Sequence, residues 1–225
     1  MPRGGQRGRA MFDAVLFDLD GTLVDTESVA VATGIAAFAA VGVIVSQAFM
    51  QSMVGKDHAA TRAIIGLQHP HVDMVHLQGL WQQGFATSIA ADLRLKAGVR
   101  ELLGAITLPM AVVTSSGRVE ARAKVETAGL AHHFRLIISV DDVTHAKPAP
   151  EPFLLAARQL GVDPARCLVF EDSDTGAESA HRAGCTVVQV PDMQPSTGPF
   201  AHHLAPDILA GARMAGLPLA AVISS

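Results

Sequence analysis

Short apolar runs and longer helix-like segments alternate along most of this 225-residue chain. A short apolar run bounded by turn residues is typical of a strand that is buried on both faces of a sheet. The alternation of such runs with helical segments predicts a doubly wound α/β domain with a mainly parallel sheet. We expect strands at residues 12–17, 109–113, 136–140, 167–170 and 186–190.

Three of the segments between these runs carry start and stop signals for helices. Residues 120–126 consist mainly of good helix formers, and a glycine follows shortly afterwards. Residues 150–160 open on a proline, which the first helical turn tolerates, and Gly161 follows them. A third helix is expected to begin near Asp174 and to end before Gly184.

Residues 26–96 contain no convincing strand, although they lie between the first and second predicted strands. A mostly helical segment of this length is too long for a loop in a compact domain. We therefore expect a helical cap over residues 26–96, with linkers near residues 25–27 and 94–98. The cap would be inserted into a core domain made of residues 11–25 and 97–225.

Residues 28–55 form a charge-free stretch that is long enough to raise the question of a membrane span. However, the stretch contains alanine, glycine, serine and valine more than leucine or isoleucine, so the free energy of its insertion would be marginal. We interpret it as a buried cap helix with the turn after it, and we expect no membrane association. A weaker interpretation is a dimer contact, so the chain is expected to be a monomer or a homodimer.

The charge balance is mildly acidic, with 17 Lys and Arg against 21 Asp and Glu and a formal net charge of −4. The first ten residues contain three arginines and no acid, so the remaining chain is more acidic still. This balance argues against nucleic-acid binding by the folded body.

Residues 1–10 are expected to form a flexible tail, and they lack the apolar segment of a secretory leader. Cys167 and Cys185 both lie in apolar runs, where packing in the core is a better interpretation than a disulfide. We therefore expect a cytoplasmic location.

Two carboxylates, Asp18 and Asp20, follow the first predicted strand. Strand periodicity sends alternate side chains to the same face, so the two carboxylates can project together from the strand end. Gly21 then permits a sharp turn. Carboxylates at the carboxyl end of a strand, where open α/β sheets bind ligands, suit metal binding and covalent catalysis.

Further polar motifs follow the later strands in an ordered series. They are DLDGT at 18–22, VVTSS at 112–116, KPAPEPF at 147–153 and EDSDTG at 171–176. With these motifs the chain resembles the haloacid dehalogenase (HAD) superfamily. The resemblance is greatest to its Mg-dependent phosphatases, including the phosphoglycolate-phosphatase-like and β-phosphoglucomutase-like members with a helical cap. It covers nearly all of the chain after residue 11 and implies a HAD-like Rossmannoid core.

The resemblance implies phosphoryl transfer through an aspartyl-phosphate. Asp18 would be the nucleophile, because an ionised carboxylate attacks phosphorus without needing a base. Asp20 would protonate the leaving alcohol and then deprotonate the hydrolytic water. Thr114 would donate its hydroxyl to a phosphoryl oxygen, and Lys147 would neutralise charge on the phosphoryl group.

A cation is also expected, because carboxylates that face a phosphate dianion repel it. Mg²⁺ fits, since it takes oxygen ligands and binds substrate phosphate. The resemblance implies ligation by Asp18, by the main-chain carbonyl of Asp20 and by Asp172. Glu171 is expected to orient a metal-bound water from the second coordination sphere.

Four further residues are candidates for contacts with the substrate. Ser115 is expected to offer a backbone N–H to the phosphoryl group. Lys56 and His58, in a stretch that resembles the cap loop facing the active site, are candidates for contacting a polar or anionic leaving group, and so is Arg118. For the two cap residues an ordinary solvated loop is an equally good interpretation.

The expected activity is hydrolysis of a small phosphate ester, with a sugar or polyol phosphate favoured. Asp20 argues against dehalogenation, because a halide leaving group needs no proton. Mutases of this superfamily often have Val after the Asp-Gly pair, so Thr22 favours a hydrolase over a β-phosphoglucomutase-like enzyme. A non-catalytic, phosphate-dependent regulator is the third alternative, although a binder needs no proton shuttle.

Overall fold

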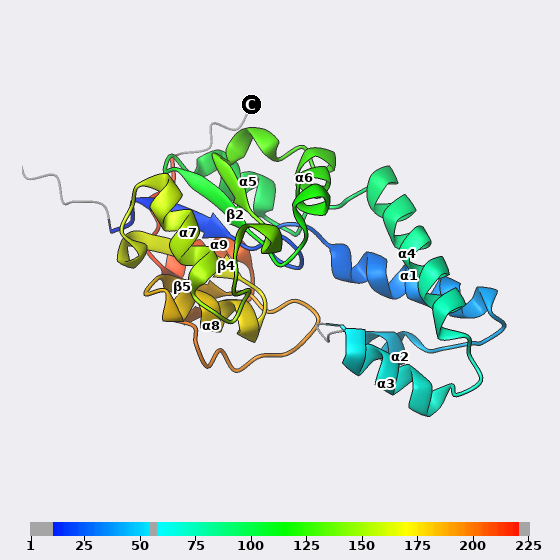
Figure 1. Cartoon of the computed structure of the whole chain (residues 1–225). Coiled ribbons are helices and arrows are strands. Elements are labelled where there is room, and N and C mark those ends of the chain that lie inside the picture. Colours follow the sequence, from blue (N-terminus) through cyan, green and yellow to red (C-terminus); the bar gives the residue numbers. More distant parts are fainter. Residues whose placement is uncertain (1–10, 55–57, 221–225) are drawn as a thin grey trace, which may run out of the picture.

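A six-stranded parallel sheet forms the centre of the molecule, as the computed structural model shows (Figure 1). The structure describes residues 11–54 and 58–220. The strand order is β3-β2-β1-β4-β5-β6, and every neighbouring pair runs parallel. The predicted doubly wound α/β fold is therefore confirmed. The strands are β1 (Ala14–Phe17), β2 (Met110–Val113), β3 (Leu136–Ile138), β4 (Cys167–Glu171), β5 (Thr186–Gln189) and β6 (His203–Leu204).

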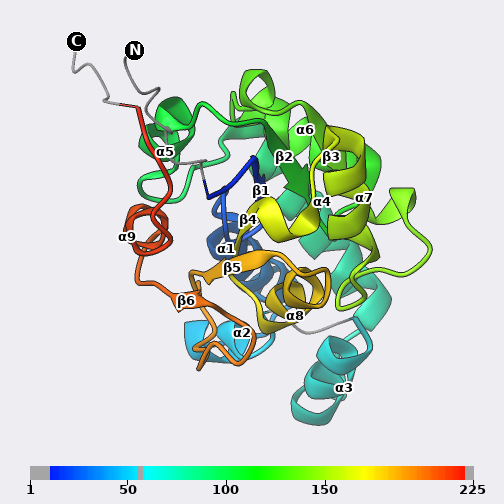
Figure 2. The ribbon, with the colours of Figure 1, turned by 90° about the vertical axis from the view of Figure 1, so that its left-hand side faces the viewer.

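Both faces of the sheet are covered by helices (Figure 2), which is why its central strands are apolar except for Glu171 at the end of β4. On β1, Val15 and Phe17 pack in one core cluster, whereas Ala14 and Leu16 pack in another on the opposite face. The first cluster includes residues of α5 (Val99–Ala105), α6 (Arg118–Thr127) and α9 (Ile208–Met214). The second includes residues of α7 (Glu151–Leu160) and α8 (Asp174–Arg182).

The predicted elements differ from the observed ones mainly at their ends. All five predicted strands are present, but β3 stops at Ile138 because a short 3-10 helix begins at Val140. The two-residue strand β6 is too short to produce an apolar run and was not predicted. Gly161 ends α7 in a left-handed conformation with φ +72°. The 3-10 helices are η1 (Ala131–His133), η2 (Val140–Asp142) and η3 (Pro164–Arg166).

Four helices between β1 and β2 form a second body, here called the helical unit: α1 (Thr26–Ala40), α2 (Gln47–Gln51), α3 (His58–Gln68) and α4 (Met74–Ala91). They stand to one side of the sheet and pack around their own apolar cluster (Figure 1). This cluster includes Phe38 and Leu77, which are fully buried. The charge-free stretch contributes α1, the loop after it and α2. Among the described residues, no helix is long and apolar enough to span a membrane.

The two connections to the helical unit lie side by side. The Asp25 amide donates to the Arg94 carbonyl at 2.9 Å, and the Lys96 amide donates to the Leu23 carbonyl at 3.0 Å. The chain therefore enters and leaves the helical unit through one short paired segment.

Candidate active site

Three carboxylates gather where β1 and β4 end. Asp18 follows β1 directly, Glu171 is the last residue of β4, and Asp172 comes next. β1 and β4 are hydrogen-bonded neighbours, so their ends lie together at the edge where open sheets bind ligands. One oxygen of each carboxylate lies within 4.8 Å of the other two. We call these three residues the acidic cluster.

Lys147 connects the cluster to the neighbouring strand. Its ammonium donates to Asp18 Oδ1 at 2.6 Å, to Glu171 Oε1 at 2.6 Å and to the Val113 carbonyl at 2.9 Å. The Lys147 side chain is only 4% exposed. Three acceptors therefore satisfy all three donors of the ammonium.

The cluster holds more negative charge than Lys147 offsets. Burial raises the pKa of Asp18 to about 8, although Lys147 opposes the shift and Glu171 adds to it. Burial and the charges of Glu171 and Asp18 also raise the pKa of Asp172. Burial by itself lowers the pKa of Lys147, but the two carboxylates outweigh it and the pKa is raised. Lys147 therefore stays charged.

This donor set fits a hard divalent cation. Its ligating atoms would be carboxylate oxygens, and a cation would offset the carboxylate repulsion that adds to burial in raising the pKa values of Asp18 and Asp172. Glu171 is less free to ligate, because its Oε2 accepts from the Ser173 amide at 3.2 Å and hydroxyl at 3.0 Å. A side chain at Gly21 would meet the carboxylate of Asp172 at 2.5 Å, so glycine keeps the two strand ends close.

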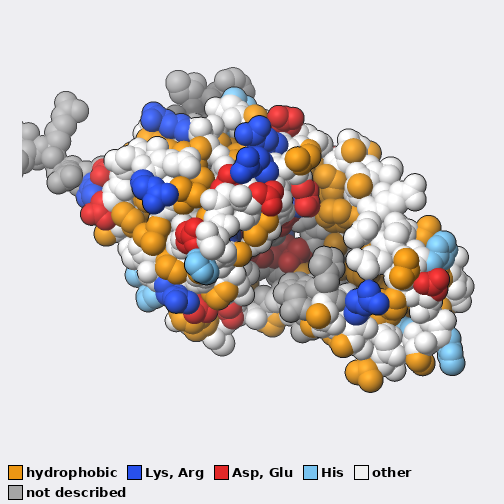
Figure 3. Space-filling view, in the orientation of Figure 1, with side chains coloured by type: hydrophobic (Ala, Val, Ile, Leu, Met, Phe, Trp, Pro, Cys, Tyr) orange, Lys and Arg blue, Asp and Glu red, His pale blue; other side chains and the backbone are white. Residues whose placement is uncertain are grey.

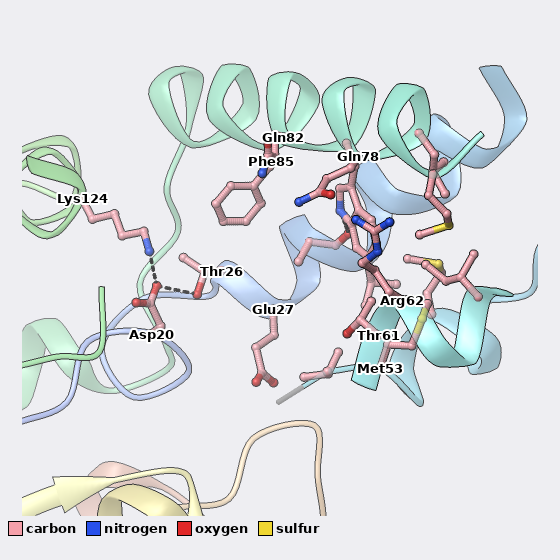
Figure 4. A pocket seen from close by; sticks show the side chains of 18 residues that line it. Asp20, Thr26, Glu27, Met53, Thr61, Arg62, Gln78, Gln82, Phe85 and Lys124 are labelled. Carbon is pink, nitrogen blue, oxygen red and sulfur yellow. Dashed lines mark hydrogen bonds and ion pairs between the residues drawn. The ribbon is translucent and has the colours of Figure 1, made fainter. Parts of the chain in front are cut away.

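Asp20 lies in a different set of contacts (Figure 4). Its Oδ1 accepts from the Thr26 hydroxyl at 2.8 Å and from the Lys124 ammonium at 2.7 Å. Its Oδ2 accepts from the Ser116 hydroxyl at 2.8 Å. Both oxygens of the Asp20 carboxylate are thus held by protein donors.

Sequence reasoning missed Lys124, Ser116 and Thr26. Lys124 follows Glu120 by four residues, which is the pattern of an exposed helical ion pair. A signal was present, however, because apolar residues at positions 121, 125 and 128 lie on the same helical face as residue 124. That face is buried, and the lysine is buried with it.

The other predicted residues are placed in different ways. Thr114 is buried at the end of β2, and its hydroxyl accepts from the Ser116 amide at 3.0 Å. Ser115 is exposed beside it. Arg118 opens α6, where its guanidinium pairs with Asp142 at 2.6 Å. Lys56 lies outside the described residues, as does the tail at 1–10, and the side chain of His58 is likewise not described.

A cavity of about 400 Å³ lies between the helical unit and the sheet edge (Figure 4). Asp20 and Lys124 line it from the sheet side, and residues of all four helices of the unit line the remainder. Arg118 does not line it. Figure 3 shows acidic side chains where the surface is hollowed between the two bodies. The polar residues that the helical unit contributes include Thr26, Glu27, Thr61, Arg62, Gln78 and Gln82.

Glu27 sits where the helical unit meets the loop after β5. Its Oε2 accepts from the Met193 amide at 3.3 Å. Burial and the nearby charge of Asp192 raise the pKa of Glu27 to about 7. Asp192 in turn pairs with Lys96 on the returning connection. The position of the helical unit is therefore tied to carboxyl groups that are not part of the acidic cluster.

Comparison with known proteins agrees with this geometry. A sequence model of haloacid dehalogenase-like hydrolases matches residues 15–190. Fructose-1-phosphate phosphatase YqaB of Escherichia coli (strain K12) is 35% identical over 188 residues, which cover 80% of this chain and 96% of that protein. N-acetylmuramic acid 6-phosphate phosphatase of Pseudomonas aeruginosa is 34% identical over 187 residues, covering 81% of this chain and 83% of that protein.

A solved structure extends the likeness to the fold. The HAD family hydrolase of Deinococcus radiodurans R1, with bound phosphate and sodium, is 29% identical and superposes with a TM-score of 0.72. The match covers 92% of this chain and 89% of that one. Because the family match spans most of the chain and includes all four strand-end motifs, this protein belongs to the haloacid dehalogenase-like hydrolases.

Proposed function

We propose that this protein is a Mg²⁺-dependent phosphatase that hydrolyses a small phosphorylated metabolite through a phosphorylated Asp18. One observation carries the proposal. Asp18, with Lys147 on one oxygen and Asp172 nearby, adjoins a second carboxylate, Asp20, that lines the cavity. Phosphate ester hydrolysis needs a nucleophile, negative charge that binds a cation, and a proton carrier beside a space of the size of the substrate.

The first half-reaction transfers the phosphoryl group to the protein. An oxygen of Asp18 forms a bond to phosphorus, and the bond between phosphorus and the ester oxygen breaks. The departing alkoxide takes a proton from Asp20 and leaves as the alcohol. Lys147 holds the attacking carboxylate in place and offsets charge on the phosphoryl oxygens. The buried Thr114 donates its hydroxyl to a phosphoryl oxygen.

The second half-reaction restores the enzyme. Asp20 accepts a proton from water as the water oxygen bonds to phosphorus, and the bond from phosphorus to Asp18 breaks. Inorganic phosphate is released, and both aspartates return to their starting states. Asp18, Asp172 and the main-chain carbonyl of Asp20 would hold Mg²⁺, which would supply positive charge to stabilise the phosphoryl oxygens.

The helical unit acts in this proposal as the cap, spanning residues 26–96. It closes over the strand ends, excludes bulk water and contacts the leaving group. Gln78, Gln82 and Arg62 line the cavity opposite Asp20 and offer donors for hydroxyl groups. The two curated relatives are named for fructose 1-phosphate and N-acetylmuramic acid 6-phosphate, which supports a sugar or polyol phosphate as substrate.

A panel of sugar and polyol phosphates with Mg²⁺ tests the proposal. Phosphate release is measured for the wild type and for Asp18→Asn, with circular dichroism to verify folding. We expect turnover that requires Mg²⁺ and is lost in the variant. Turnover that survives in Asp18→Asn contradicts the covalent mechanism. Conversion of a sugar 1-phosphate into its 6-phosphate without phosphate release identifies a mutase instead.

A further inference from the structure

We propose that Lys124 is a positioning residue that orients the Asp20 carboxylate for proton transfer to the leaving group. This inference rests on the proposed function, because it assigns Lys124 a part in the step that Asp20 performs. The motifs at the strand ends do not contain Lys124, which comes instead from the middle of α6.

The contacts of Lys124 connect three residues around the cavity. Its ammonium donates to Asp20 Oδ1 at 2.7 Å, to the Ser116 hydroxyl at 3.0 Å and to Glu120 Oε1 at 2.5 Å. The Ser116 hydroxyl in turn donates to Asp20 Oδ2 at 2.8 Å. Lys124 therefore holds one oxygen of the Asp20 carboxylate directly and the other through Ser116. Rotation of this carboxylate would break both links.

A surface ion pair does not account for this arrangement. Lys124 is only 3% exposed, whereas the Glu120 side chain is 54% exposed. Burying an ammonium costs free energy, and an exposed helical pair repays little of it. Asp20, whose side chain is 31% exposed, is the less exposed of the two carboxylate partners of Lys124. An ion pair of this kind contributes more to a defined geometry than to stability.

The helical unit covers the same lysine. The ring of Phe85 on α4 lies with its centroid 5.9 Å from the ammonium, and both residues line the cavity. Asp20, Lys124 and Phe85 thus form one wall of the space that receives the leaving group. Lys124 fixes the carboxylate on the side of the cavity from which the proton must be delivered.

The leaving group provides the test. A strongly basic leaving oxygen needs a proton from Asp20, whereas a weakly basic one departs without it. We would measure kcat/KM for phenyl, nitrophenyl and dinitrophenyl phosphate, which are similar in shape and differ in the basicity of the departing phenolate. This ratio covers only the steps up to departure of the leaving group, so the later hydrolysis of phosphorylated Asp18 does not enter it.

For Lys124→Met we expect kcat/KM to fall about 30-fold with phenyl phosphate and less than about 3-fold with dinitrophenyl phosphate, within the range that proton transfer contributes. Lys124→Arg keeps the charge and should recover part of the loss with phenyl phosphate. If Lys124→Met does not fold, Ser116→Ala removes the hold on Oδ2 without leaving a buried charge unpaired. It should show the same dependence on the leaving group, with a smaller amplitude.

Two controls separate the possible failures. Lys96→Met also removes a lysine–carboxylate pair, but one that does not involve Asp20, so its effect should be equal for all three substrates. Asp20→Asn should show the leaving-group dependence in full. If the loss in kcat/KM depends on the leaving group in Asp20→Asn but not in Lys124→Met or Ser116→Ala, the proposed role of Lys124 is contradicted. If Asp20→Asn lacks this dependence too, the proposed function of Asp20 is wrong.

Discussion

Asp18 and Asp20 are two residues apart in the sequence, yet their surroundings are opposite in charge balance. Asp18 shares the single ammonium of Lys147 with Glu171 and lies beside a third carboxylate, Asp172. Asp20 has an ammonium and two hydroxyl groups on its own carboxylate. The surroundings of Asp18 carry surplus negative charge, whereas those of Asp20 are satisfied by the protein.

This difference in charge balance matches the catalytic role proposed for each residue. A nucleophile that meets a phosphate dianion benefits from a site that a cation completes, because metal and substrate then bind to the same surplus charge. A proton carrier instead needs a fixed direction, which protein donors provide without a ligand. In the proposed mechanism, Asp18 would therefore act together with a metal ion, whereas Asp20 would act without one.

The largest expected effect tests whether the Asp18 surroundings hold the nucleophile. Asp18→Asn should lower turnover by at least ~10⁴-fold, as removal of a covalent catalyst does. Folding should be retained, because a neutral amide avoids the burial cost that raises the pKa of Asp18. Steady-state phosphate release together with a thermal melt measures both. A melt at far lower temperature would mean that Asp18 is structural.

The next effect tests whether Lys147 offsets the surplus charge. Lys147→Met should lower kcat by about 10²–10³-fold, the usual cost of removing one preorganised charged donor. Arg166→Met serves as the control, because it removes an ion pair with Asp13 at the other end of β4. That variant should leave kcat unchanged. Similar losses in both variants would count against a specific role for Lys147.

A third effect tests whether a cation completes the Asp18 surroundings. Mg²⁺ at 100 times its dissociation constant should stabilise the metal-free protein by about 2.7 kcal/mol. For a chain of this size the melting temperature should rise by roughly 5–10 °C. The rise should disappear in Asp172→Asn, which removes a ligand. An equal rise in that variant would place the cation elsewhere.

The smallest effect concerns Glu27, outside both aspartate sites. The pKa of Glu27 is raised from 4.5 to about 7, so in this interval the folded protein keeps a proton that the unfolded chain has released. The stability that this proton contributes is present at low pH and is lost as the pH rises through 7. Glu27→Gln mimics the protonated form, so its advantage in melting temperature over the wild type should grow between about pH 4.5 and 7 and level off above pH 7.

Thermal melts across the pH range check this prediction against Glu101→Gln, an exposed glutamate of α5. The melting temperature of Glu101→Gln should change with pH in the same way as that of the wild type over the whole range. The groups that face Glu27 are Asp192, Lys96 and Asp172, and they are the same in both variants. A constant difference between Glu27→Gln and the wild type would show that Glu27 carries no unusual proton.

Much of the fold and of the acidic cluster was predictable, because the information is local. Buried parallel strands produce continuous apolar runs, and the polar residues at their carboxyl ends must share one edge of the sheet. Asp18 was found in this way, whereas Asp172 and Lys147 were assigned from the motifs that resemble those of the HAD superfamily. The strand β6 was missed because two residues form no pattern.

The sequence by itself determined the order of strands and helices, and with it the edge of the sheet where four polar motifs meet. Only the tertiary structure decided which charges are balanced there. The Asp20 contacts come from Thr26 on α1, Ser116 after β2 and Lys124 on α6. Such contacts depend on how separate elements pack, and an ammonium that is buried beside a carboxylate has the same sequence pattern as one that is exposed to water.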